Sequence, residues 1–280
     1  MVTVTVSLMA ISDLHIAHPE NREHLAALRP SHKDDWLIVA GDVAERISDF
    51  EWAIGTLTAR SAKVVWAPGN HELWTPRDDP NQLRGERRYQ HLVEICRCHG
   101  VLTPEDPYPV WHGPGGPVQI VPLFVLYDYS FRPAGAATKA EGLAIAHRAG
   151  VVCTDEYLLH PDPFPTRDAW CRARVTLTEE RLAARGTDHP TVLVNHFPLE
   201  REPTRILRYP EFAQWCGTER TADWHLRYDA AVVVYGHLHI PRSTVRDGVR
   251  FEEVSVGYPR EWRRRGGPAG PRPVFPGGLR

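Results

Sequence analysis

The chain has 280 residues, of which 42% are hydrophobic and 24% are charged, and its formal net charge is -2. This length supports one large domain with a full hydrophobic core or two small ones. The nearly balanced charge gives no support for a nucleic-acid-binding protein, a role that would require a local basic patch.

The first hundred residues alternate apolar segments of strand type with segments of helical spacing. The strand-type segments are apolar or β-branched and end at polar or glycine residues. In the helical segments apolar residues recur every three or four positions, as at Phe50, Ile54 and Leu57. The predicted strands are 2–11, 36–40 and 63–67, and the predicted helices are 20–28, 47–60 and 83–98. This alternation predicts a layered α/β fold with buried parallel strands.

The rest of the chain is less regular. Residues 103–117 are rich in Pro and Gly and are predicted to form a loop. Asp247-Gly248, between two strand-type segments, is a strong signal for a hairpin turn. The further predicted strands are 118–126, 191–194, 230–235, 243–246 and 249–256, and the further predicted helices are 138–149 and 166–185. We expect a single domain over residues 1–260, followed by an Arg-, Gly- and Pro-rich, mobile tail over residues 261–280.

No segment has the features of a targeting sequence or a membrane span. Residues 1–10 lack a basic start followed by a long apolar run, so no signal peptide is indicated. No stretch approaches the ~18 apolar residues of a transmembrane helix. The five cysteines are odd in number and irregularly spaced, which argues against a disulfide framework and favours a reducing compartment. We therefore expect a cytoplasmic protein with no membrane partner.

One event recurs five times along the chain: a predicted apolar strand ends, and residues of metal-ligand type follow at once. In layered α/β sheets ligands bind beyond the carboxyl ends of the strands, so five such loops can converge on one site. Glycine in these loops lets the backbone turn sharply. The five motifs are Asp13-Leu14-His15, Gly41-Asp42, Gly69-Asn70-His71-Glu72, Asn195-His196 and Gly236-His237-Leu238-His239.

The ligand types in these motifs suit two divalent metal ions. Carboxylates, imidazoles and one carboxamide together favour Mn or Fe, with Zn as an alternative, over Ca or Mg. Seven ligands are too many for one ion but fit two ions about 3.5–4 Å apart that share a bridging carboxylate. The seven candidate ligands are Asp13, His15, Asp42, Asn70, His196, His237 and His239. Two ions this close indicate hydrolysis of a phosphoester.

Each motif taken alone has a simpler explanation. Asp-x-His is usually a turn with a surface histidine, and Gly-His-x-His alone is also typical of a mononuclear zinc site. The five motifs in a fixed order, each after a predicted strand, are far more specific than any one of them. A binding protein that kept the fold and lost catalysis is a further alternative. Such a protein usually loses ligands or the catalytic histidine, and all of them are present here.

The ordered motifs resemble those of the calcineurin-like metallophosphoesterase superfamily over residues 13–239. The resemblance implies a four-layered α/β/β/α sandwich of two mixed sheets. It also implies that Asp13, His15, Asp42 and His239 hold one metal and that Asp42, Asn70, His196 and His237 hold the other. His71 would then donate a proton to the leaving oxygen or bind a phosphate oxygen.

A more specific resemblance extends over nearly the whole chain. Segments 35–45, 120–129 and 251–262 are similar to those of the actinobacterial 4'-phosphopantetheinyl hydrolases. These enzymes remove the phosphopantetheine arm from holo acyl carrier proteins, so the resemblance implies such a carrier protein as substrate and partner. The alternative is a phosphodiesterase with the same metals that acts on a nucleotide or another small-molecule phosphoester.

Two further sets of residues are candidates for binding that substrate. Because carrier proteins are acidic, we expect a basic docking face, although such charges often only face solvent. The candidates are Arg84, Arg87 and Arg88 on one helix and Arg260, Arg263, Arg264 and Arg265 near the end of the chain. Trp74, Tyr127 and Asp128 are candidates for lining the pocket beside the metals, with a place in the core as the alternative for the aromatic residues.

Overall fold

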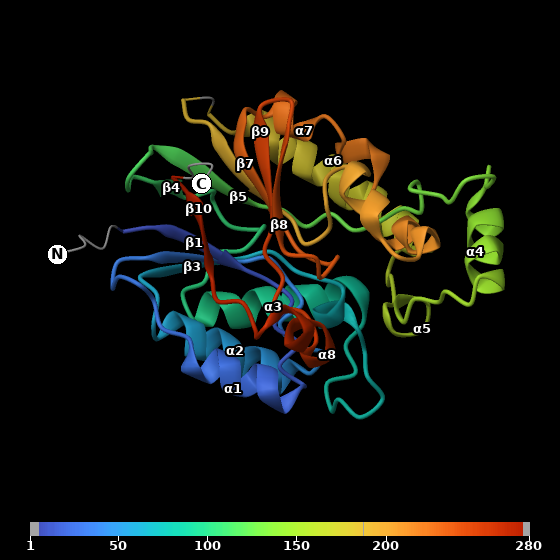
Figure 1. Ribbon diagram of the computed structural model, residues 1–280, viewed down its shortest axis with the longest axis horizontal. Coiled ribbons are helices and arrows are strands. Elements are labelled where there is room, and N and C mark those ends of the chain that lie inside the picture. The colour runs from blue at the N-terminus through green and yellow to red at the C-terminus, as the bar shows by residue number, and fades with distance from the viewer. Residues whose placement is uncertain (1–5, 187, 277–280) are drawn as a thin grey trace.

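The computed structural model describes residues 6–186 and 188–276, and its strands form two mixed sheets packed against each other (Figure 1). The strand order is β10-β1-β2-β3 in the first sheet and β4-β5-β6-β7-β9-β8 in the second. β10, β4 and β8 run antiparallel to their neighbours, and the other pairings are parallel. The first sheet contains β1 (Leu8–Ile11), β2 (Trp36–Val39), β3 (Lys63–Trp66) and β10 (Arg272–Phe275). The second contains β4 (Val110–Trp111), β5 (Val118–Pro122), β6 (Thr191–Val194), β7 (Ala230–Tyr235), β8 (Arg242–Arg246) and β9 (Val249–Glu253).

Helices cover the outer face of each sheet, which gives the four-layered α/β/β/α order that the resemblance implied. In Figure 1 α1, α2 and α3 lie against the first sheet, α6 and α7 lie against the second, and α4 lies at one end. The helices are α1 (Pro19–Ala27), α2 (Ile47–Thr58), α3 (Gly85–Cys98), α4 (Lys139–Arg148), α5 (Asp155–Leu158), α6 (Arg167–Ala184), α7 (Trp224–Arg227) and α8 (Pro259–Trp262). Short 3-10 helices are η1 (His71–Leu73), η2 (Glu202–Ile206), η3 (Pro210–Trp215), η4 (Glu219–Thr221) and η5 (Arg263–Arg265). Within the described ranges no helix combines the length and the apolar character needed to cross a membrane.

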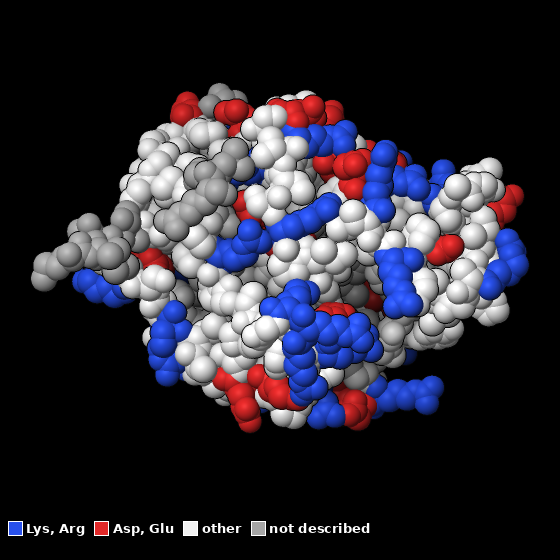
Figure 2. Space-filling view, viewed as in Figure 1, with Lys and Arg blue, Asp and Glu red and all other residues white. Residues whose placement is uncertain are grey.

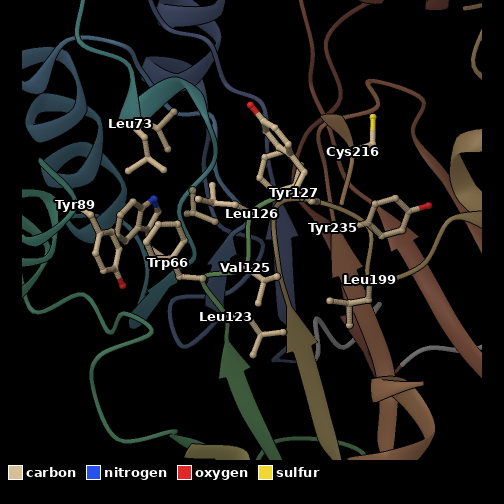
Figure 3. Packing of buried hydrophobic residues seen from close by; sticks show 14 of the residues in the cluster. Trp66, Leu73, Tyr89, Leu123, Val125, Leu126, Tyr127, Leu199, Cys216 and Tyr235 are labelled. Carbon is tan, nitrogen blue, oxygen red and sulfur yellow. The ribbon is translucent and has the colours of Figure 1, made fainter. Parts of the chain in front are cut away.

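The layer between the two sheets is filled by alternate residues of the strands. Ile38 and Val65 from the first sheet meet Val192 from the second in this layer, and all three are fully buried. Their strand neighbours face the helices instead: Trp66 stacks on Tyr89 of α3 with ring centroids 6.4 Å apart (Figure 3). Because both faces of the central strands are covered, β1, β2 and β7 are apolar at every position rather than at every second one.

The two sheets meet at the carboxyl ends of their parallel strands. Beyond β1 and β9, Ser12 and Ser255 form a parallel bridge that joins one sheet to the other. Ser12 N donates to Val254 O at 3.1 Å, and Val256 N donates to Ser12 O at 2.9 Å. The loops that follow β1, β2, β3, β6 and β7 therefore open at one common edge.

The structure differs from the sequence prediction after β5. The predicted strand 118–126 ends at Pro122, and residues 123–126 remain buried without joining the sheet. Asn195 replaces a neighbouring strand there, because its side chain accepts from Val125 N at 3.1 Å and donates to Val125 O at 3.2 Å. An apolar run signals burial, and only its hydrogen-bond partners decide whether it is a strand.

The prediction of a mobile tail over residues 261–280 is wrong for residues 272–275. These residues form β10, which pairs antiparallel with β1 at the edge of the first sheet. Val274 is fully buried between the sheets, and Arg250 donates to its carbonyl oxygen. The Arg, Gly and Pro composition concealed a short strand that covers an otherwise open sheet edge. The last part of the predicted tail, residues 277–280, lies outside the described residues.

Candidate metal centre

The seven candidate ligands lie together at the edge where the two sheets meet. Six of them are buried, and the side chain of the seventh, His239, is 13% exposed. The loops after β1, β2, β3, β6 and β7 contribute, in that order, Asp13 with His15, Asp42, Asn70, His196, and His237 with His239. The strand-end motifs thus converge in space as the sequence predicted.

One group of ligand atoms comes from Asp13, His15, Asp42 and His239. His239 Nε2 lies 3.0 Å from Asp13 Oδ1 and 3.1 Å from His15 Nε2. His15 Nε2 lies 3.8 Å from Asp13 Oδ1 and 3.9 Å from Asp42 Oδ2. Neighbouring ligands of one ion are roughly 3.0–3.5 Å apart when the metal–ligand distance is about 2.1 Å, so this group could surround a single metal ion.

A second group shares Asp42 with the first. His196 Nε2 lies 3.3 Å from Asp42 Oδ2, 3.2 Å from Asn70 Oδ1 and 3.2 Å from His237 Nδ1. Asp42 Oδ2 faces both His15 and His196, so this one oxygen is the atom that the two groups share. The two groups are those that the family resemblance implied.

Five of the seven residues adopt a left-handed backbone conformation. The φ angles are 53° at Asp13, 41° at His15, 55° at Asp42, 68° at His237 and 56° at His239. Residues other than glycine rarely adopt this conformation, which costs about 1–3 kcal/mol at each position. Hydrogen bonds between loops hold two of them, from Asp13 N to Gly41 O at 2.9 Å and from His15 N to Asp42 O at 3.0 Å. Strain of this kind, concentrated on residues that face one point, is typical of a functional site.

Two of the glycines in the motifs are required by close contact. A Cβ on Gly69 would lie 2.1 Å from Asp42 Oδ1, and a Cβ on Gly236 would lie 2.2 Å from Asp13 Oδ2. Any larger residue would therefore displace a carboxylate of the site. Gly41, with a φ of 83°, is the glycine that serves the sharp turn we expected.

Hydrogen bonds from surrounding residues orient the oxygen ligands. Ser12 and Ser255 both donate to Asp13 Oδ2, at 2.6 Å and 2.7 Å. Asn70 Nδ2 donates to Asp155 Oδ1 at 2.9 Å, so the carbonyl oxygen of Asn70 is the atom left facing the centre. Outer partners of this kind fix the ligand atoms before any ion binds.

The histidines are oriented in the same way. His239 Nδ1 lies 2.8 Å from Glu261 Oε2, and His196 Nδ1 lies 2.9 Å from Ala40 O. These acceptors hold the Nδ1 proton, so Nε2 of each ring is left to face the other ligands. His237 is turned around, with Nδ1 toward the centre and a buried Nε2 that has no partner in the described part of the chain.

Glu72, the last residue of its motif, joins two ligand loops rather than the ligand groups themselves. Its carboxylate accepts from the backbone N–H groups of Asp42, Val43 and Gly69 at 3.0, 2.9 and 3.1 Å. Burial and the negative charge of Asp42 raise the pKa of Glu72 to about 7, although the N–H groups oppose this shift. Glu72 thus holds the loops after β2 and β3 in register with each other.

His71 lies beside the two groups and is surrounded by three other side chains. Its Nδ1 lies 2.8 Å from Glu45 Oε1, and its ring centroid lies 3.7 Å from that of Trp74. Its Nε2 lies 3.7 Å from Asp42 Oδ2 and 3.5 Å from the hydroxyl of Tyr258. Burial opposes the charged ring, but Asp42 and Glu45 outweigh it and raise the pKa of His71. A raised pKa favours the protonated imidazole, which is the form that acts as a general acid.

The electrostatics of the centre fit divalent cations. Burial opposes ionisation of Asp13 and Asp42, but neighbouring histidines keep the pKa of both carboxyl groups below its usual range. Burial also opposes a charged His196, yet Asp42 and Asp13 raise its pKa to about 10. The pKa of His237 falls to about 3, because burial and the charge of His196 both disfavour protonation. Buried carboxylates and closely opposed imidazoles form a donor set that a pair of metal ions would satisfy.

Comparisons with known proteins agree with this geometry. Residues 6–241 match the family model of the calcineurin-like phosphoesterases. The chain belongs to this family. It is 62% identical over 259 residues to the acyl-carrier-protein phosphodiesterase PptH of Mycobacterium tuberculosis, an alignment that covers 92% of this chain and 80% of that protein. The crystal structure of the phosphopantetheinyl hydrolase PptH from Mycobacterium tuberculosis superposes with a TM-score of 0.96 at 59% identity, covering 99% of this chain and 98% of that chain.

The family assignment confirms the predicted fold and makes the chain a phosphoesterase, and therefore a hydrolase. A cavity of about 500 Å³ opens over the candidate metal centre. Asp42, Asn70, His71 and His237 are among the residues that line it. Trp74 lines the same cavity, as the sequence analysis expected.

Tyr127 and Asp128, which we expected beside the metals, do not line the cavity. Tyr127 is buried in the core (Figure 3). Its ring packs edge-on against those of Tyr129 and Phe197. Asp128 lies 3.5 Å from Arg220 in an ion pair. The reason is the path of the chain after β5, which passes through the core before it reaches the surface.

The arginines of α3 do not form the docking face that we expected. Arg88 is fully buried, lies 3.3 Å from Asp79 and donates to the backbone carbonyls of Glu45 and Glu72. It supports the loops that carry these two residues. Arg84 and Arg87 are exposed, but neither lines the cavity.

The arginines near the end of the chain lie at the cavity. Arg260 lines it, and Arg263, Arg264 and Arg265 are exposed on η5. Figure 2 shows basic side chains gathered at the position that α8 occupies in Figure 1. This second arginine group therefore remains a candidate for docking.

Four residues of the site were missed by sequence reasoning: Glu45, Asp155, Tyr258 and Glu261. Glu45 could have been found from the sequence, because it lies only three residues after Asp42 in the same loop. Tyr258 and Glu261 lie in a segment that carried the resemblance, but no spacing rule connects them to the metals. Asp155 carries no sequence signal, because it comes from α5 and meets Asn70 only through the fold.

Proposed function

We propose that this phosphoesterase removes 4'-phosphopantetheine from holo acyl carrier proteins. The proposal is carried by one observation: the chain is 62% identical, over 92% of its length, to a protein named as an acyl-carrier-protein phosphodiesterase. The cavity beside His71 supports it, because a volume of about 500 Å³ is in the range of small-molecule sites.

Under this proposal the two ligand groups would hold two divalent ions. Asp13, His15, Asp42 and His239 would hold one ion, and Asp42, Asn70, His196 and His237 would hold the other. Ions bound there would lower the pKa of a water nucleophile and stabilise charge on the phosphoryl oxygens. The mixed oxygen and nitrogen donor set favours Mn or Fe, with Zn as the alternative.

His71 has the role of general acid. The oxygen of the attacking water forms a new bond to phosphorus, and the bond between phosphorus and the serine oxygen of the carrier protein breaks. His71 gives its proton to that serine oxygen, and the proton that the water loses restores the protonated His71, so the products are apo carrier protein and 4'-phosphopantetheine. Glu45 holds the ring through Nδ1, so Nε2 is the atom that donates.

We also propose that the enzyme acts in the cytoplasm. All five cysteines are free, and four of them are buried. Free thiols in this number are typical of a reducing compartment.

The test is incubation of the purified enzyme with Mn²⁺ and a holo carrier protein, followed by mass spectrometry of both products. We expect apo carrier protein and 4'-phosphopantetheine in equal amounts. Unchanged holo protein, together with cleavage of cyclic nucleotides or another small diester, would favour the small-molecule phosphodiesterase instead. A chelated enzyme, which should be inactive until Mn²⁺ is restored, is the control for metal dependence.

A further inference from the structure

Two different walls bound the cavity above the metal centre. One carries an aromatic, a cationic and an acidic side chain, and we call it the arginine wall: Tyr258, Arg260 and Glu261. The other is apolar apart from Arg208, and we call it the apolar wall: Leu207, Tyr209 and Phe212. A cavity with two chemically different sides can bind an asymmetric substrate in one direction only.

The two walls are anchored to different parts of the fold. Next to the arginine wall, Trp262 Nε1 donates to Asn21 Oδ1 of α1 at 2.8 Å. Next to the apolar wall, Gln214 donates to the carbonyl oxygen of Gly142 in α4 at 3.3 Å. α1 belongs to the first-sheet side of the molecule and α4 lies at its end, so the walls are independent structures (Figure 1).

Each wall faces a different ligand group. The ring of Tyr258 stacks on His15 at 4.4 Å and lies 4.8 Å from His239, both of which belong to the first group. The ring of Phe212 stacks on His237 of the second group at 5.9 Å. A phosphodiester centred over both groups therefore extends one arm toward each wall.

The general acid identifies which arm faces the arginine wall. The free nitrogen of His71, Nε2, lies 3.5 Å from the Tyr258 hydroxyl. The guanidinium of Arg260 lies over the same tyrosine ring, 5.3 Å from its centroid. The oxygen that receives the proton must lie close to His71 Nε2, so the leaving serine is on the Tyr258 side.

The surface beyond Tyr258 carries positive charge that other residues do not neutralise. Arg260 and Arg264 are exposed, and neither forms an ion pair within residues 6–186 and 188–276. Arg263 pairs with Glu20, and Arg265 donates to the carbonyl oxygens of His239 and Val256. Figure 2 shows this basic cluster over α8. An acidic protein surface is the partner that complements it.

The apolar wall offers a different surface. The side chain of Tyr209 is 51% exposed, and Ile206 beside it is 47% exposed. Exposed apolar side chains at the edge of a cavity mark a place where a ligand covers them. A long, uncharged chain of methylene, methyl and amide groups such as pantetheine suits this wall.

Resting on the proposed function, we propose that the substrate binds in one direction. The carrier protein docks on the arginine wall, with Arg260 as its main contact, and the pantetheine arm lies against the apolar wall. Of the two arginine groups considered from the sequence, only the one near the end of the chain takes part in docking.

Three substrates of the same phosphodiester charge test the two walls separately. Holo carrier protein has both arms, pantetheine 4'-(4-nitrophenyl phosphate) has the arm without the protein, and bis(4-nitrophenyl) phosphate has neither. The variants are Arg260→Glu, Tyr209→Ser and, as a charge-matched control at an exposed position of α3 that does not line the cavity, Arg87→Glu. Turnover of bis(4-nitrophenyl) phosphate reports whether each variant is folded and loaded with metal.

We expect Arg260→Glu to raise the KM for holo carrier protein about tenfold relative to the KM for either small diester. Tyr209→Ser should raise the KM of both arm-containing substrates about fivefold relative to bis(4-nitrophenyl) phosphate. Arg87→Glu should change the KM for holo carrier protein, and the KM for the pantetheine diester, by no more than about twofold relative to the KM for bis(4-nitrophenyl) phosphate. In the wild type, the KM for holo carrier protein should rise with ionic strength, and Arg260→Glu should weaken that dependence.

Two results would overturn the assignment. One is an Arg260→Glu effect of equal size on all three substrates. The other is a larger effect on holo carrier protein from Arg208→Glu, since Arg208 lines the cavity on the side of the apolar wall. Failure of the wild-type enzyme to cleave any holo carrier protein would instead refute the proposed function, and the Tyr209→Ser comparison with the small diesters would still test the apolar wall.

Discussion

The floor and the walls of the cavity are built in opposite ways. The floor is formed by the seven candidate ligands, which follow strands of two sheets; four of them line the cavity itself, and five of the seven have a left-handed backbone. The walls come from short helices and loops, and Tyr209 of the apolar wall is 51% exposed. The floor is thus fixed by the core of the fold, whereas the walls are attached to its surface.

This difference separates chemistry from recognition. A ligand atom on the floor cannot move without breaking sheet pairing or a hydrogen bond such as that from Ser255 to Asp13. The walls can change without disturbing the metal positions, which is how one fold accommodates many substrates. Substitutions on the floor should therefore affect every substrate alike, and those on the walls should affect substrates selectively.

The largest effect is expected for Asp42→Asn. Both ligand groups lose the shared carboxylate oxygen, so metal occupancy should fall together with activity. A loss of several kcal/mol of transition-state stabilisation corresponds to a fall in kcat/KM of about 10³–10⁴-fold or more. Metal analysis by mass spectrometry should show fewer than two ions per chain. Two tightly bound ions and near-normal activity would contradict the bridging role.

His71→Ala should have a smaller effect of a different kind. The proposed general acid is removed while the seven proposed ligands remain, so kcat should fall about 10²–10⁴-fold with two ions still bound. The loss should shrink for diesters with a good leaving group such as 4-nitrophenolate, because that group needs little protonation. An equal loss for all leaving groups would point instead to binding of a phosphate oxygen.

Glu45→Gln tests the partner of that acid. Burial lowers the pKa of His71, but the negative charges of Asp42 and Glu45 outweigh burial and raise it above its usual value. A general acid is active while protonated, so activity is lost as pH rises through its pKa. Removal of the Glu45 charge should lower that pKa and shift the alkaline limb of the kcat profile to lower pH. An unshifted limb would show that the limb belongs to another group.

The comparison also explains what the sequence could predict. Strand-end motifs such as Gly69-Asn70-His71 lie where the sheet topology brings strand ends together, so the convergence of these loops could be predicted from the sequence. The sequence analysis placed Tyr127 beside the metals because it comes soon after a strand, as the metal-ligand motifs do. In the structure the segment after β5 turns into the core, and Tyr127 is buried there. Arg88 appeared to lie on a basic face, but burial against Asp79 is a tertiary outcome that helical spacing cannot reveal.

The cavity walls were largely unpredictable for the same reason. Phe212 and Tyr258 are separated by more than forty residues and lie in segments with no periodic pattern. β10 was missed because four residues in a Pro- and Gly-rich tail give too short a signal, although the open edge of β1 supplies their partner. The cavity walls and β10 depend on partners from elsewhere in the chain, so they can be identified only once the fold is known.

The smallest effect is expected for Asp155→Ala, which removes a link between the candidate ligand Asn70 and Trp74 of the cavity lining. Asp155 accepts from Asn70 Nδ2 at 2.9 Å and from Trp74 Nε1 at 2.7 Å, so it connects a proposed metal ligand to a cavity wall. In Asp155→Ala the Asn70 amide can rotate, and affinity for the second ion should fall about 10–100-fold, as for other outer partners of metal ligands. Raising the Mn²⁺ concentration should restore much of the kcat.

Asp128→Asn, which changes a carboxylate outside the cavity, is the matched control and should need no extra Mn²⁺. If Asp155→Ala retained normal metal affinity and changed only the KM for the substrate, Asp155 would act through Trp74, and the floor would be independent of the walls.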